Sequence, residues 1–449
     1  MNEIQAYLKV FESRKMAALL FLGFASGLPL FLTSRTLQAW MTTEGVDLKS
    51  IGLFSLVALP YSLKFLWSPL LDRFVPPFLG RRRGWLVIAQ VGLVLAIAAM
   101  YLQDPSELVR ATLPNPDSCS TGLAGIREFQ ALCVFWQSFQ AVSRSPLFWT
   151  ALGIAFLSAT QDIAYDAYRT DVLEKWEMGA GAAIGVLGYR LALILTGSIA
   201  FILADRMPWP VVYLLLAGLM LLSVIPSFLA PEPPKRDDTP QTLSEAVWLP
   251  FQEFFARSGL TRGISILIFI VLYRLGDALI NNMVTPFLLQ IGFSATKIGT
   301  IQGGMGMIAT IVGVLVGGSL LSRWGINRSL WIFGVLQCLS NFAYFVLAQT
   351  GKNDSVMVLA INIENFCGGL GTAAFVAFLM SLCNQRFSAT QFALLSSLMA
   401  VSRDILVAPA GGIAQEIGWT WFFFVTILAA LPGLLLLPFF APWNEEAGK

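Results

Sequence analysis

The sequence contains no histidine. This absence excludes histidine-ligated metal sites, Ser-His-Asp hydrolase triads and proton relays through imidazole, because each of them needs that side chain. Carboxylates are then the natural protonatable groups of this chain. We predict no metal site and no cofactor.

Charged residues are scarce too, at 12% of 449 positions, whereas 56% of the residues are apolar. A soluble domain needs more charged surface than this, so we expect a membrane protein of the all-α class. Apolar runs of about 20 residues recur, which is the length that a helix needs to cross the bilayer. We predict twelve transmembrane helices, centred near Leu28, Tyr61, Val94, Ser158, Leu193, Met220, Asp277, Ala309, Val335, Cys367, Val401 and Leu431.

Cysteine is also sparse, with five residues in the chain. The three C-terminal cysteines lie in predicted spans and are typical of small apolar packing residues. Cys119 and Cys133 instead fall in a long connection, at about 104–145, which we place outside the cytoplasm. Disulfides persist on that side of a bacterial membrane. These two residues are either bridged or two free thiols.

Two stretches half a chain apart have nearly the same sequence: residues 70–74 are LLDRF and residues 320–324 are LLSRW. Further matches at nearly the same offset are Gly45, Ile51 and Gly52 against Gly292, Ile298 and Gly299. Collinear matches of this kind indicate a parallel repeat, whose halves pack around a substrate site near the bilayer midplane. Transport is therefore the first functional hypothesis.

The boundary between the halves lies at Pro231-Glu232-Pro233-Pro234, because this run ends the sixth predicted span. Apolar residues then recur at near-helical spacing from Leu243 to Phe255, which predicts an amphipathic helix on the cytoplasmic face. Pro250 should interrupt it. The predicted domains are a six-helix half at 1–230, which includes the loop at about 104–145, a linker at 231–262, and a second six-helix half at 263–449.

Positive charges set the predicted orientation, because cytoplasmic loops hold an excess of lysine and arginine. Both termini are placed in the cytoplasm, since that arrangement leaves fewer basic residues in the segments on the opposite side. The cytoplasmic segments then hold Arg14, Lys15, Arg73, Arg81, Arg82, Arg83, Arg169, Lys175, Lys235, Arg236, Arg257, Arg262, Arg323, Arg328 and Arg386.

Charges inside the predicted spans are the strongest indication of a site, because each costs about 2.5 to 3.5 kcal/mol at a helix centre. Arg190 and Arg403 lie at nearly the same depth in equivalent spans of the two halves, and paired cations at the midplane indicate an anionic substrate. Aromatic faces would suit a sugar ring. The predicted substrate-binding residues are Arg35, Gln38, Lys64, Tyr165, Tyr189, Arg190, Arg274 and Arg403.

Carboxylates in the spans are candidates for proton coupling. Asp162 and Glu364 come first, and Asp277 and Asp404 come second because each has an arginine in the same span that could hold it ionised. Asp166 lies one turn from Asp162 on the same helix face, close to the cytoplasmic boundary. For every one of these charges the alternative is an interhelical ion pair that only fixes the bundle.

The repeated loops predict an inner gate. Asp72 has no role in topology, so we interpret it as part of a charge latch that breaks and reforms as access alternates. The alternative is that the basic residues of these loops only set the orientation. The predicted gating residues are Asp72, Arg73, Arg81, Arg82, Arg83, Arg323 and Arg328.

Several longer motifs occur in order between about residues 16 and 440. They are FASGLP at 24–29, LQAWM at 37–41, KFLWSP at 64–69, GRRRGW at 80–85, QDI at 161–163, LGYR at 187–190, ENFCGG at 364–369 and FSATQFAL at 387–394. With these motifs the chain strongly resembles the AmpG family of muropeptide permeases, in the major facilitator superfamily.

This resemblance implies a twelve-helix major facilitator fold and import of N-acetylglucosaminyl-1,6-anhydro-N-acetylmuramyl peptides from periplasm to cytoplasm. It also implies coupling to protons, a bacterial inner-membrane location, and roles in cell-wall recycling and β-lactamase induction. We expect a monomer in the bilayer that binds no nucleic acid.

Three rival functions stay open at this point. The nearest rival is a carrier for another bulky anion, such as acetyl-CoA. A membrane-embedded transferase would need a catalytic constellation on a loop, and none is visible, so we expect no enzyme. A signalling receptor is disfavoured because no soluble output domain follows Ala441.

Overall fold

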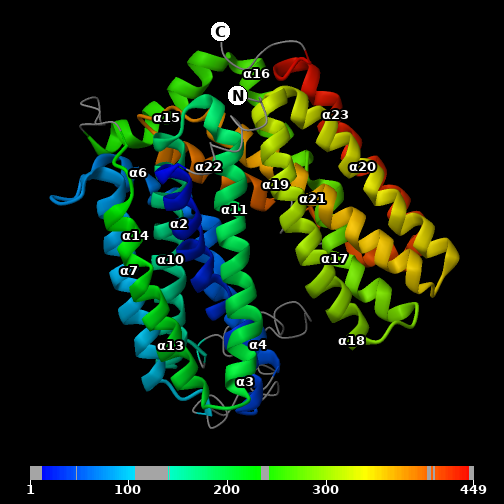
Figure 1. Cartoon of the computed structure of the whole chain (residues 1–449), viewed down its shortest axis with the longest axis horizontal. Helices are drawn as coiled ribbons and strands as arrows, with labels where there is room; N and C mark the ends of the chain where they lie inside the picture. Colours follow the sequence, from blue (N-terminus) through cyan, green and yellow to red (C-terminus); the bar gives the residue numbers. More distant parts are fainter. Residues whose placement is uncertain are drawn as a thin grey trace, which may run out of the picture.

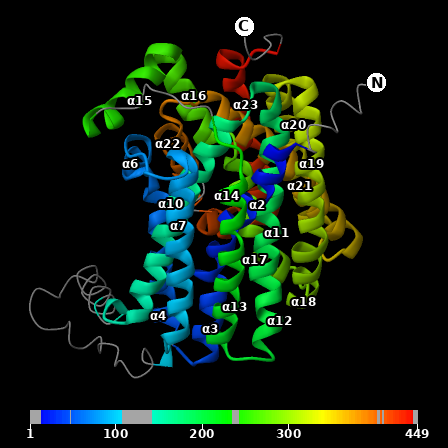
Figure 2. The same cartoon turned by 60° about the vertical axis from the view of Figure 1, so that its left-hand side comes forward.

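The computed structural model of the protein describes residues 13–46, 48–106, 140, 142–233, 242–401, 406–407 and 410–443. In this part of the chain every regular element is a helix, and the helices form two bundles side by side (Figure 1). Helix α2 begins and helix α23 ends at the same end of the molecule, which we call the termini end (Figure 2).

The first bundle precedes residue 231. Its described elements are α2 (Arg14–Leu32), α3 (Arg35–Thr43), α4 (Leu48–Leu53), η1 (Phe54–Ala58), α5 (Leu59–Leu63), η2 (Lys64–Leu66), α6 (Ser68–Arg73), α7 (Gly80–Ala99), η3 (Met100–Leu102), α10 (Pro146–Val172), η5 (Lys175–Glu177), α11 (Met178–Ile194), η6 (Leu195–Ile199), α12 (Ala200–Ala204), α13 (Trp209–Leu222) and α14 (Val224–Leu229).

The second bundle follows a connecting helix, α15 (Leu243–Ser258). Its described elements are α16 (Leu260–Leu272), α17 (Leu275–Gln290), α18 (Ala295–Ile298), η7 (Gly299–Met305), α19 (Gly306–Trp324), α20 (Ile326–Thr350), α21 (Asp354–Leu382), α22 (Ser388–Val401) and α23 (Ala410–Phe440).

Ten helices of the described residues are long and apolar enough to cross a membrane, and the predicted all-α membrane fold is confirmed. The twelve predicted spans differ from these ten at two places. The span near Tyr61 is broken into short turns from α4 to α6, because Pro60 and Pro69 each stand in the first turn of a new short helix. Of the span near Val401, the structure describes α22, and residues 402–405 lie outside the described part.

One long span of the second bundle is discontinuous. Helices α16 and α17 are joined by a turn at Tyr273 and Arg274, and Arg274 is the residue from which α17 starts. A break inside the membrane leaves backbone groups unpaired, and transporters place such breaks where a polar ligand binds.

The two bundles contact each other near the termini end. There α11 packs against α19, and α6 and α10 pack against α22, while the ribbons diverge toward the end that carries α4 and α18 (Figure 1). The α11–α19 crossing is close because Gly179 and Gly318 have no side chains. A Cβ on Gly179 would lie 2.5 Å from a Leu321 methyl, and one on Gly318 would lie 2.3 Å from Ala183 Cβ.

Helix α15 lies across the termini end and packs against α6, α16 and α22 (Figure 2). Its buried residues, Ala246, Pro250 and Phe254, recur every fourth position and so share one face. The predicted interruption at Pro250 is wrong, because the helix runs through this residue. A proline removes one hydrogen bond of the helix, and the packing of α15 against α6, α16 and α22 holds the helix together across this position.

Candidate functional site

Asp72, the penultimate residue of α6, joins the two bundles at the termini end. Its side chain is fully buried. One carboxylate oxygen accepts from Arg82 Nη2 at 2.8 Å, and the other accepts from the Thr390 backbone N–H at 2.8 Å and the Thr390 hydroxyl at 2.7 Å. Thr390 lies in the first turn of α22, where helix N–H groups are unpaired and the helix dipole favours an anion. The carboxylate therefore binds the start of a helix from the other bundle.

Arg82 extends this contact. Besides Asp72, it forms an ion pair with Asp171 at 2.7 Å and donates to the Ser388 hydroxyl at 2.6 Å. The guanidinium is 2% exposed, and two carboxylates around it offset the cost of burying its charge. Arg81 adds hydrogen bonds to the carbonyls of Gln385 at 3.0 Å and Arg386 at 3.2 Å. We call Asp72, Arg82, Asp171, Ser388 and Thr390 the gate cluster.

The other predicted gating arginines lie elsewhere. Arg83 pairs with Glu232 and donates to two carbonyls at the end of α14, within its own bundle. Arg73 lies over the Phe74 ring, with the guanidinium carbon 5.6 Å from the ring centroid. In the second repeat Arg323 is exposed, and Arg328 donates to the Trp443 carbonyl at 3.3 Å.

In the first bundle, α10 and η2 bring together three of the predicted charges, Lys64, Asp166 and Arg169. Asp166 is neutralised twice, by Arg169 at 2.8 Å in its own helix and by Lys64 at 3.4 Å. Asp162, one turn away, accepts a hydrogen bond from Ser26 of α2. No ion pair reaches Asp162 in the described part of the chain. The interhelical ion pair that was the alternative for these charges thus occurs at Asp166 and not at Asp162.

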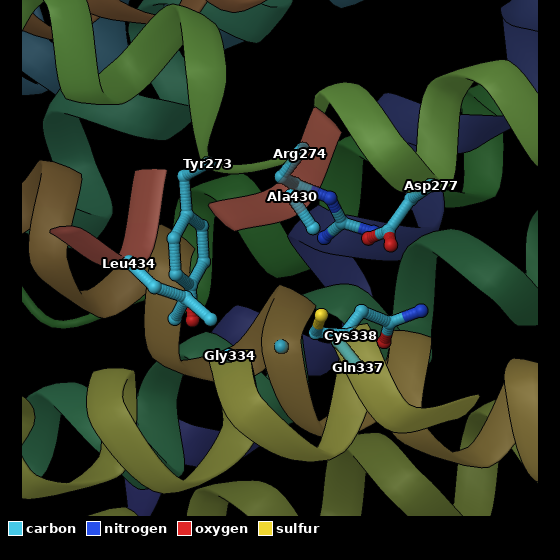
Figure 3. Close-up of a pocket in the computed structure, with 9 residues that line it drawn as sticks. Tyr273, Arg274, Asp277, Gly334, Gln337, Cys338, Ala430 and Leu434 are labelled. Atoms are coloured by element: carbon cyan, nitrogen blue, oxygen red, sulfur yellow. The ribbon is translucent and has the colours of Figure 1, made fainter. Parts of the chain in front are cut away.

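In the second bundle the charges lie at the break between α16 and α17. Arg274 Nη2 forms an ion pair with Asp277 at 3.4 Å (Figure 3). Its other terminal nitrogen donates to the Thr372 hydroxyl of α21 at 2.7 Å. Glu364 of α21 is buried and accepts from the Asn281 amide at 3.4 Å. As at Asp162, no ion pair to Glu364 is found within the described residues.

Arg190 of α11 faces this group from the first bundle. It lies within electrostatic range of Arg274 and Glu364, is partly exposed, and makes no hydrogen bond or ion pair with the described residues. Two arginines from different bundles, only one of them paired, therefore lie close enough to repel each other.

The remaining predicted substrate residues occupy different surroundings. Arg35 and Gln38 are exposed on α3, and the Arg35 guanidinium lies 5.1 Å from the Phe31 ring centroid. The Tyr165 hydroxyl donates to the Leu19 carbonyl at 3.2 Å, inside the packing of α2 against α10. Tyr189 is partly exposed and lies within electrostatic range of Asp162. Arg403, Asp404, Cys119 and Cys133 fall outside the described residues.

Sequence reasoning missed several polar residues at these sites. Ser388 and Thr390 belong to a motif that carried the family resemblance, but neither is charged, so neither drew attention. Asp171 had a signal, because it lies close to the other acidic residues of α10. The neutral amides Asn281, Gln337 and Asn341 were not considered at all.

Known protein families and individual proteins match most of the chain. The family model of the Major Facilitator Superfamily matches residues 19–405. The chain is 47% identical to the anhydromuropeptide permease of Escherichia coli K12, over 96% of this chain and 80% of that protein. It is 31% identical to the putative transporter AmpG 4 of Rickettsia felis, over 96% of this chain and 97% of that one.

Solved structures show the same fold. The chain superposes on the proton:xylose symporter XylE with a TM-score of 0.65 at 12% identity, over 96% of each chain. It superposes on the transporter FucP in the outward conformation with a TM-score of 0.64, also at 12% identity, over 94% of this chain and 98% of that one.

The gate cluster gives a first prediction. Asp72→Asn should separate α6 from α22, because the amide loses the charge that binds both Arg82 and the α22 N-terminus. Removing one partner of a buried pair costs roughly 3 to 5 kcal/mol, and the residual Asp171 partner should keep the loss at the low end. We expect faster labelling of a cysteine introduced at Ser322, beside the α11–α19 contact, in a variant without the native cysteines.

Glu174→Gln is the matched control, because it removes one negative charge at the same end without touching the second bundle. It should label like the parent. Equal labelling of Asp72→Asn and the parent would show that Asp72 does not hold the gate.

Proposed function

The chain belongs to the anhydromuropeptide permease family of the major facilitator superfamily, and we propose that it imports N-acetylglucosaminyl-1,6-anhydro-N-acetylmuramyl peptides together with protons. It is a multi-pass membrane transporter and not an enzyme. The observation that carries the substrate proposal is the 47% identity to the Escherichia coli permease over 96% of this chain.

The geometry of the central arginines supports an anionic substrate of this kind. Arg190 and Arg274 come from different bundles and lie within electrostatic range of each other. Like charges in low dielectric repel, so an anion between them lowers the energy of the site. The peptide stem of an anhydromuropeptide supplies carboxylates that can bind both cations. Such a ligand would also hold the two bundles in one relative position.

Two carboxyls support proton coupling. Asp162 and Glu364 each bind a neutral donor, Ser26 or Asn281, and have no ion pair within the described residues. A carboxyl of this kind can change its protonation state without first breaking a salt bridge. Asp166 is held by two cations and so is less suited to that role. We propose Asp162 and Glu364 as the proton carriers.

The orientation belongs to the same proposal. We place the termini end in the cytoplasm of a bacterial cell, because Arg81, Arg82, Arg83, Arg323 and Arg328 cluster there and basic loops face inward. The gate cluster then closes the cytoplasmic side of the inner membrane. The candidate residues come from both bundles of one chain, which supports a monomeric transporter.

Uptake into proteoliposomes tests the function directly. The purified protein should accumulate labelled anhydromuropeptide when the outside is made acidic, and a proton-conducting ionophore should abolish the accumulation. A labelled CoA ester in a parallel assay tests the rival substrate. Uptake of the CoA ester in preference to the anhydromuropeptide would contradict the proposal.

Charge removal at the central site should weaken substrate binding. Arg190→Gln and Arg274→Gln each delete a charged hydrogen bond to the substrate, so KM should rise by about 10-fold to 150-fold, the equivalent of roughly 1.5 to 3 kcal/mol. Arg403, which lies outside the described residues, is a predicted substrate residue too, and Arg403→Gln should have the same effect. Arg206→Gln, which removes an exposed arginine between α12 and α13, serves as the control. Binding as tight as the wild type in both central variants would refute their assignment.

Carboxylate removal should separate exchange from accumulation. Asp162→Asn and Glu364→Gln keep the size and one hydrogen-bond acceptor but carry no titratable proton. We expect both variants to exchange substrate across the membrane in a counterflow assay and to lose gradient-driven accumulation. Unchanged accumulation in both would assign proton coupling to other residues.

A further inference from the structure

Two amide side chains of α20, Gln337 and Asn341, are buried, and Gln337 lies within electrostatic range of Asp277. Their exposed fractions are 6% and 0%, and none of their four amide atoms has a hydrogen bond within the described residues. They are four residues apart and therefore lie on one face of the helix. Buried amides are nearly always paired, so four unpaired atoms on one face indicate a missing polar ligand.

The space beside Gln337 fits such a ligand. A cavity of about 10 Å³, which is the size that one water molecule needs, is bordered by Arg274, Asp277, Gln337 and Cys338. In Figure 3 the guanidinium of Arg274 points toward Asp277, and Gln337 lies across the cavity from them. The Asn341 amide lies next to Gly276, with Nδ2 3.1 Å from where a Cβ would stand.

Glycines of α21 extend this space toward Glu364. A Cβ placed on Gly368 would lie 3.7 Å from Gln337 Oε1 and 4.0 Å from Glu364 Oε1, and one on Gly371 would lie 3.8 Å from Gln337 Oε1. These are ordinary contact distances, so an alanine fits at either position without a clash. The missing methyl groups leave room for a small ligand between Gln337 and Glu364.

Arg274 and Asp277 differ in their access to a ligand. The Arg274 side chain is 23% exposed, whereas the Asp277 side chain is 8% exposed. A substrate anion can therefore reach the more exposed Arg274 side chain, whereas the Asp277 side chain stays buried. If the substrate anion binds the guanidinium of Arg274, the buried Asp277 carboxylate loses its ion-pair partner.

We propose that the substrate anion displaces Asp277 from Arg274, and that a water molecule bound by Gln337 then relays a proton from the outer solution to the released carboxylate. Asp277 cannot take up a proton while Arg274 holds it, so the substrate sets the moment of proton uptake. The inference rests on the proposed import of an anionic muropeptide. It adds Gln337 as a positioning residue of the coupling step.

The charges balance in this exchange. Before binding, Arg274 and Asp277 neutralise each other; after binding, the substrate anion neutralises Arg274 and Asp277 carries one proton from the outer solution. The other titratable or charged groups around Asp277 are Tyr273, Glu364, Cys338 and Cys367, with Arg190 beyond Glu364. Each substrate carboxylate bound by Arg274 thus brings one proton into the bundle.

Three variants test this step in proteoliposomes, where a pH-sensitive dye reports protons taken up on addition of anhydromuropeptide. Gln337→Leu removes the amide, and Gly368→Ala fills the space with a methyl group in a helix that alanine favours. Both should keep counterflow exchange and lose accumulation by at least about tenfold, the scale of one charged hydrogen bond. Gln90→Leu, which removes a buried amide from α7 of the first bundle, should keep both activities.

The pH dependence of binding supplies a second readout. Wild-type affinity should rise as the pH falls, because binding takes up a proton. Asp277→Asn, which frees Arg274 permanently, should bind at every pH without proton uptake. Normal proton uptake and accumulation in both Gln337→Leu and Gly368→Ala would overturn the inference and leave the proposed import intact. A wild type that neither binds nor imports the muropeptide would overturn both.

Discussion

The structure depends on one constraint, which is that a charge inside the hydrocarbon region must be compensated. Most intramembrane charges in the described part of the chain satisfy it through neighbouring side chains: Asp166 with Lys64 and Arg169, and Arg274 with Asp277. The exceptions are Arg190, Asp162 and Glu364, which have no ion pair within the described residues. Arg190 of the first bundle and Glu364 of the second lie within electrostatic range of each other, where a substrate anion can bind the unpaired arginine.

The same constraint explains why the two repeats differ in chemistry. In the first repeat Asp72 is buried, so it needs Arg82 and the first turn of α22. The second repeat has Ser322 at the matching position, and there the bundles approach through Gly179 and Gly318 instead. One half of the contact between bundles is thus electrostatic and the other is close packing. A charged contact can be opened by competition for its partners, whereas close packing mainly fixes where the bundles touch.

Much of this arrangement could be predicted from the sequence. Hydrophobic length predicted the ten spans that the described residues show, and a duplicated loop predicted two halves and singled out Asp72. Of the arginines predicted to pair with Asp72, Arg82 does so and its neighbour Arg73 does not, and Thr390 was not predicted as a partner. That choice depends on how α6, α7 and α22 pack. The broken span near Tyr61 was missed because hydropathy averages over Pro60 and Pro69, which start new turns.

The neutral amides mark the limit of a search based on charge. Gln337 and Asn341 carry no charge and lie in an apolar helix, so a sequence gives no reason to single them out. Their burial without partners becomes visible only when α20 is packed against the break at Arg274. An amide can accept from a protonated carboxyl and donate to an ionised one. Side chains of this kind can therefore stay bound to a carboxyl through a change of its charge, which a fixed cation such as Arg274 cannot do.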